Sequence, residues 1–70
     1  MNRNYLSEAT LLAQEGKIQK SIEVLEGQVE IQGLTFSIAS NLAALNLQLG
    51  NYEASLKFCS KAIEMDPYSY

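Results

Sequence analysis

Histidine is absent from this sequence, and Cys59 is its only cysteine. One thiol cannot form an internal disulfide, and the common zinc sites require cysteines and histidines in groups. The chain also lacks a glycine-rich phosphate loop, a nucleophile motif and any metal-ligand spacing. We therefore expect no cofactor, no metal and no enzymatic activity.

Basic residues are few, with five Lys and Arg against eight Asp and Glu, and the pI is near 4.6. They are scattered among the acidic residues: Arg3, Lys17, Lys20, Lys57 and Lys61. Nucleic acids and anionic membrane surfaces are bound through clustered positive charge, so neither partner is expected. No apolar run approaches the ~20 residues of a membrane span, and no signal-peptide pattern opens the chain. A cytoplasmic location is the default expectation.

A chain of 70 residues corresponds to a single small domain, which we assign to residues 1–70. Such a chain buries only about 60% of its unfolded surface, so its stability is expected to be marginal. Folds of this size usually depend on disulfides, a metal or association with another chain. Since the first two are excluded, association remains.

Four segments carry apolar residues at helical spacing, and glycines separate the members of each pair. The apolar positions are Tyr5, Ala9 and Leu12; Ile18, Ile22, Leu25 and Val29; Ile38, Leu42, Leu45 and Leu49; and Tyr52, Leu56, Cys59 and Ile63. A softer zone from Gly27 to Thr35 lies between the pairs, and Pro67 stops the last segment. Nothing alternates like a strand. The pattern predicts an all-α fold of two helix–turn–helix hairpins.

The two hairpins repeat each other at a constant offset, which is the separation of Gly16 from Gly50. The same offset aligns further identical pairs: Ala9 with Ala43, Leu11 with Leu45, Gln14 with Gln48, Ser21 with Ser55, and Glu30 with Glu64. A constant offset across both hairpins indicates two copies of one unit, residues 2–35 and 36–69.

Residues 41–67 resemble one repeat of the tetratricopeptide family, and the offset between the two copies equals the period of that family. The resemblance rests on the Leu42-Ala43 pair, the Gly50-Asn51-Tyr52 turn, Ser55 and Cys59 four residues apart, and the Lys61-Ala62-Ile63-Glu64-Met65-Asp66-Pro67 ending. It implies a segment of right-handed α-solenoid. It also implies small residues where the hairpin helices cross (Ala43 and Ser55), a left-handed Gly50, and Tyr52 and Cys59 filling space between neighbouring helices.

The first copy departs from this pattern, with Glu8 where the second has Leu42 and Gly33 in place of the closing proline. The second copy departs at Ala39, where a large aromatic is usual, and at Asn46, where tyrosine is common. The resemblance therefore covers the whole chain but is stronger in residues 36–69.

Members of this family hold peptides or partner helices on a concave face formed mainly by the first helix of each repeat. The resemblance places on that face Arg3, Leu6, Thr10, Ala13 and Gln14 from the first copy, and Ser37, Ser40, Asn41, Ala44, Leu47 and Gln48 from the second. Relatives that bind acidic chaperone C-termini have an asparagine at the place of Asn41. That clamp also needs a lysine and a second asparagine, where Leu6 and Thr10 stand here, so a structural role for Asn41 is the preferred interpretation.

Two further features admit a chemical and a structural interpretation. Cys59 could be a reactive thiol, but no basic neighbour lies at helical spacing to activate it, which favours a buried core thiol. The row Glu23, Glu26 and Glu30 lies on one helix face, and without a cleft or a metal partner a solvated face is favoured over acid–base chemistry.

Leu56, Cys59 and Ile63 on the last helix form an apolar stripe that needs a neighbour. Two hypotheses follow. In the first, the chain is an interaction module that holds a partner peptide or helix on its concave face. In the second, it is a self-associating scaffold unit or a segment of a longer array. A homodimer could then form by exchange of hairpins through the junction 27–33, with the second and third helices fused.

Overall fold

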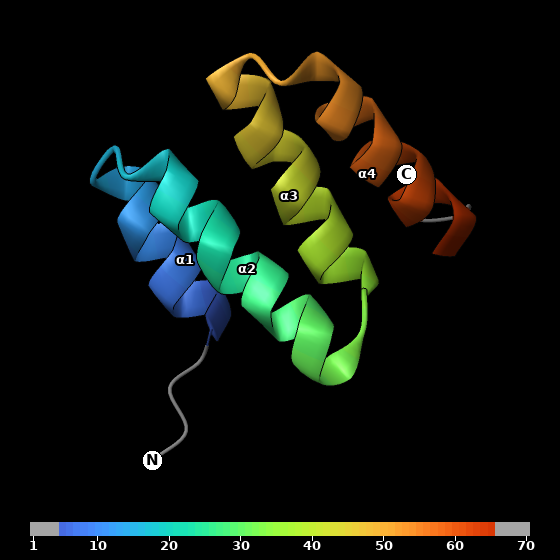
Figure 1. Cartoon of the computed structure of the whole chain (residues 1–70), viewed down its shortest axis with the longest axis horizontal. Coiled ribbons are helices and arrows are strands. Elements are labelled where there is room, and N and C mark those ends of the chain that lie inside the picture. The colour runs from blue at the N-terminus through green and yellow to red at the C-terminus, as the bar shows by residue number, and fades with distance from the viewer. Residues whose placement is uncertain (1–4, 66–70) are drawn as a thin grey trace.

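The computed structural model describes residues 5–65, and within this range the chain is all-α. The helices are α1 (Tyr5–Gln14), α2 (Ile18–Gln32), α3 (Phe36–Leu49) and α4 (Tyr52–Met65). They form two antiparallel hairpins, α1–α2 and α3–α4, joined through the contact of α2 with α3 (Figure 1). The predicted fold class of two helical hairpins is confirmed.

The two hairpin turns have the same backbone geometry. Gly16 and Gly50 adopt φ values of 86° and 85°, in the left-handed region that only glycine enters without strain. The N–H groups of these glycines donate to Ala13 O and Leu47 O, at 3.0 Å in both turns. The donors and acceptors occupy equivalent positions in the two repeats. The predicted left-handed conformation of Gly50 is confirmed, and Gly16 shares it.

The helices of each hairpin cross at an alanine and a serine. Ser21 Oγ donates to Ala9 O at 2.7 Å, and Ser55 Oγ donates to Ala43 O at 2.9 Å. These side chains are small enough for one helix to reach the backbone of the other, as the resemblance implied for Ala43 and Ser55. The same hydrogen bond at the same offset supports two copies of one structural unit.

The junction between the hairpins is short and comprises residues 33–35. Gly33, with φ of 87°, caps α2 by donating its N–H to Val29 O at 2.8 Å. Thr35 caps α3, because its Oγ1 accepts from Ile38 N at 3.2 Å. The expected soft zone from Gly27 onward is wrong for residues 27–32, which continue α2 because its regular backbone tolerates Gly27.

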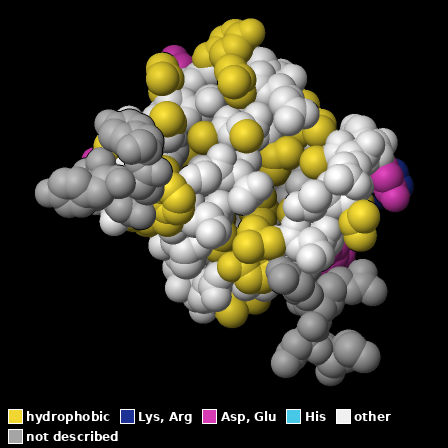
Figure 2. All heavy atoms as spheres, turned by 180° about the vertical axis from the view of Figure 1, so that it is seen from behind, with side chains coloured by type: hydrophobic (Ala, Val, Ile, Leu, Met, Phe, Trp, Pro, Cys, Tyr) yellow, Lys and Arg dark blue, Asp and Glu magenta, His cyan; other side chains and the backbone are white. Residues whose placement is uncertain are grey.

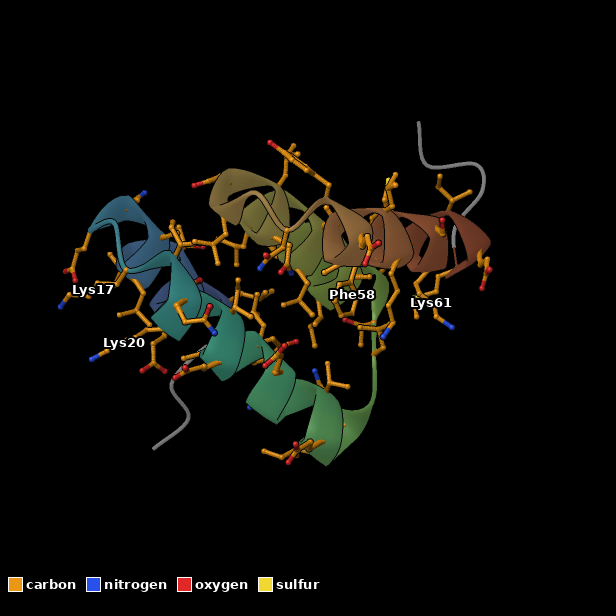
Figure 3. All side chains as sticks on the ribbon, turned by 45° about the horizontal axis from the view of Figure 1, so that its top comes forward. Lys17, Lys20, Phe58 and Lys61 are labelled. Atoms are coloured by element: carbon orange, nitrogen blue, oxygen red, sulfur yellow. The ribbon has the colours of Figure 1, made fainter. Side chains whose placement is uncertain are left out.

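The core lies where the first hairpin meets α3. Its fully buried large side chains are Leu25, Ile38 and Leu42. They belong to a cluster that also contains Ala9, Ile22 and Leu45. From α4 only Phe58 packs against this cluster, and Figure 3 shows it pointing away from the outer side of α4. Most of the apolar burial therefore lies within α1, α2 and α3.

Several predicted roles fall outside the described residues. These are the place of Arg3 on the concave face and the helix stop at Pro67.

Candidate protein-interaction surfaces

A groove of about 280 Å³ lies between α1 and α3. Its walls come from the first helix of each hairpin and include two pairs of equivalent residues, Thr10 with Ala44 and Gln14 with Gln48. Ser21 of α2 also lines it. The lining residues are Ala9, Thr10, Ala13, Gln14, Ser21, Asn41, Ala44, Leu45 and Gln48. The groove exists because small alanines at its walls leave the space between the two hairpins unfilled. Its volume is near the lower limit for ligand pockets, so it suits one or two side chains of a partner segment.

The groove is lined by neutral side chains throughout. Gln14 and Gln48, which are equivalent in the two repeats, supply two amides that can donate and accept hydrogen bonds. Asn41 donates its Nδ2 to Ser37 O at 2.8 Å, and this bond orients its amide oxygen as an acceptor. α1 lies behind α2 in Figure 1 and faces the viewer in Figure 2. On this face, hydrophobic side chains (yellow) together with backbone and uncharged polar side chains (white) fill the centre, and charged side chains lie at the rim.

The groove brings together some of the predicted concave residues and not others. Thr10, Ala13 and Gln14 line it from α1, and Asn41, Ala44 and Gln48 line it from α3. Leu6 lies beside it, in a shallow depression that shares Thr10 and Gln14 with it. Three predicted residues are not among the lining residues: Ser37, Ser40 and Leu47. The resemblance did not assign Ala9, Ser21 and Leu45 to the site, although their small size or core position was visible in the sequence.

The outer face of α4 is a second surface, and it is apolar. Tyr52 is 64% exposed, Leu56 69% and Ile63 45%, and Cys59 is exposed as well. The expectations that Cys59 is a buried core thiol, and that Tyr52 and Cys59 fill space between helices, are therefore wrong for the described chain.

The repeat gives the physical reason for this difference. The residues of α2 at the equivalent positions are buried or half-buried: Ile18, Ile22, Leu25 and Val29. The packing of α3 on α2 covers them. Among residues 5–65, no helix packs on α4 in the way that α3 packs on α2. The same positions therefore change from core to surface between the two copies.

Charged groups gather at neither surface. Glu23, Glu26 and Glu30 are all exposed on α2, which agrees with a solvated face. Figure 3 shows Lys17 and Lys20 at one end of the molecule and Lys61 at the other. The described part of the chain contains no group of three His, Cys, Asp or Glu side chains able to hold a metal ion. In that same part, no helix is long and apolar enough to cross a bilayer.

Comparison with known families identifies the repeated unit. Residues 38–69 match the family model described as tetratricopeptide repeat, and they comprise α3, α4 and the turn at Gly50. Residues 38–69 form a tetratricopeptide repeat. No curated protein and no solved structure shows a significant match to the chain.

The first hairpin has the geometry of this tetratricopeptide repeat although the family model does not extend over it. Its left-handed glycine and its Ser–Ala hydrogen bond stand at the positions equivalent to those of the second hairpin. The resemblance stated from the sequence is therefore confirmed. Tetratricopeptide repeats are in general protein-interaction modules and typically have no catalytic role.

Proposed function

We propose that the chain binds a short, uncharged segment of a partner protein in the groove between α1 and α3. The observation that supports this proposal is the neutral lining, in which the amides of Gln14, Asn41 and Gln48 surround small alanine side chains. Such amides pair well with the backbone of an extended peptide, and the alanines leave room for its side chains.

The absence of charged side chains from the groove lining determines the kind of partner. A carboxylate held without a cation would lose its charge-assisted hydrogen bonds and would also lose solvation. An acidic peptide terminus is therefore disfavoured. A neutral partner is bound mainly by apolar contact and amide hydrogen bonds, so its affinity should vary little with salt concentration. We propose that this binding takes place in the cytoplasm.

A library of short random peptides displayed on phage and selected on the immobilised chain provides the probe. The affinity of a selected peptide is then measured by fluorescence anisotropy. Ala44→Arg should weaken binding at least about tenfold, because Ala44 is an exposed groove residue and the arginine would fill the space. Asn41→Ala should give a smaller loss.

Gln19→Arg is the matched control, since Gln19 is exposed on α2 and does not line the groove. It adds the same cation and should bind the peptide like the unchanged protein. Equal affinity of the Ala44→Arg protein, or selection dominated by acidic peptides, would count against the proposal.

A further inference from the structure

The outer face of α4 carries four residues that form one continuous stripe, called here the α4 stripe: Tyr52, Leu56, Cys59 and Ile63. Their spacing of four, three and four residues places them on a single helix face. This face differs from the one that contacts α3, to which Ser55, Phe58 and Ala62 belong. The α4 stripe is thus available without any change in the fold.

We propose that the α4 stripe is the interface of a weak two-fold dimer, in which the stripes of two copies of this chain pack antiparallel. The spacing is the same when read in either direction, so the stripe is complementary to itself. The two-fold axis crosses α4 at the midpoint of the stripe, level with the step from Lys57 to Phe58. Tyr52 then lies opposite Ile63 of the second copy, and Leu56 lies opposite its Cys59. Each apolar side chain therefore meets another, as an isologous interface requires.

Stacking of copies in a head-to-tail array is disfavoured by a charge on α1. In the chain, Leu42 of α3 is fully buried in the cluster that it shares with Leu25 of α2. At the equivalent position α1 has Glu8. Placing α1 of a second copy on the α4 stripe would bring this carboxylate against apolar side chains, at a cost in desolvation. The two-fold arrangement places no charged side chain on the stripe.

The size of the α4 stripe indicates a reversible dimer. Tyr52, Leu56 and Ile63 each leave on the order of 100 Å² accessible, so their complete burial in both copies removes on the order of 600 Å² from solvent. Stable interfaces bury more than about 1,000 Å² in total, and smaller ones are transient. Glu53 and Glu64 flank the stripe, and in this register Glu53 lies near Glu64 of the second copy. Since salt screens that repulsion, added salt should tighten the dimer.

The first experiment is sedimentation equilibrium over a range of protein concentrations. The chain should show a concentration-dependent dimer, and Leu56→Glu should abolish it while circular dichroism stays helical. Ile31→Glu is the matched control, because Ile31 is 78% exposed on α2 and lies outside the stripe. A monomer at all concentrations would overturn the proposal. A dimer that weakens when salt is added would also overturn it. A dimer that survives Leu56→Glu would overturn it as well, and would indicate instead that hairpins are exchanged through residues 33–35.

The second experiment uses the thiol. In the two-fold arrangement the Cys59 side chains of both copies lie close to the axis, so a short bismaleimide should join them into a covalent dimer. In a head-to-tail array Cys59 would face α1, which contains no cysteine. Absence of a cross-linked product in a solution that sediments as dimer would therefore exclude the two-fold arrangement.

Discussion

Ile22 and Leu56 occupy the same place in the two repeats, yet Ile22 is 3% exposed and Leu56 is 69% exposed. Replacing each with alanine removes the same number of carbon atoms from the chain. Ile22→Ala creates a cavity in the core beside Leu25 and should lower the free energy of unfolding by about 2–5 kcal/mol. Leu56→Ala removes an exposed side chain and should change the free energy of unfolding by no more than about 0.5 kcal/mol.

Urea unfolding followed by circular dichroism measures both values, at protein concentrations low enough to keep the chain monomeric. A chain of this size has only ~3–5 kcal/mol of stability, so the loss from Ile22→Ala is comparable to the whole. Ile22→Val is a milder substitution that should cost about 1 kcal/mol and lower the Tm by about 4–8 °C. Equal losses for Ile22→Ala and Leu56→Ala would refute the inference that only the α2 face is covered.

Further predictions concern the backbone and its caps, and the same urea titration tests them. Gly27 lies inside α2, where an added Cβ meets nothing within 4 Å, so Gly27→Ala should stabilise the chain by about 0.5–1 kcal/mol. Gly50→Ala should destabilise it by about 1–2 kcal/mol, because the left-handed backbone is strained for alanine. Thr35→Ala removes the N-cap of α3 and should cost about 1 kcal/mol. Ser21→Ala should also cost about 1 kcal/mol, through loss of its buried hydrogen bond to Ala9. If Gly27→Ala lowered the free energy of unfolding, this would contradict a continuous α2. If Ser21→Ala left that free energy unchanged, the crossing of α1 and α2 would need only a small side chain and not the hydrogen bond.

The helices and their turns could be predicted from the sequence because local signals specify them. The apolar spacing and the glycines at 16 and 50 sufficed to give four helices in two hairpins. Gly27 misled the prediction of the junction, because a single glycine costs a long helix only about 1 kcal/mol and does not end it. The cap by Thr35 was overlooked although a threonine before an apolar run is a recognised start signal.

The burial of α4 could not be predicted from its own residues. Leu25 and Cys59 are equivalent in the repeat, but Leu25 is fully buried and Cys59 is exposed. The face of α2 that carries Leu25 is covered by α3. Among residues 5–65, no helix covers the face of α4 that carries Cys59. The groove could be predicted in part, since the family resemblance implied a shared face for Thr10, Asn41 and Gln48, which do line it. It also implied Leu47, which does not line the groove, because the lining depends on how the hairpins stack.

The order of helix packing has a consequence for how the chain folds. Extensive packing joins α1 to α2, α2 to α3 and α3 to α4, so each step of assembly closes only a short loop. Chains with such local contacts fold in microseconds to milliseconds. Either hairpin can nucleate and present a surface for the other, as in a one-dimensional array. Because α4 contributes little to the central cluster, we expect it to exchange its amide hydrogens faster than α2 and α3, so that unfolding begins at the helix that carries the exposed stripe.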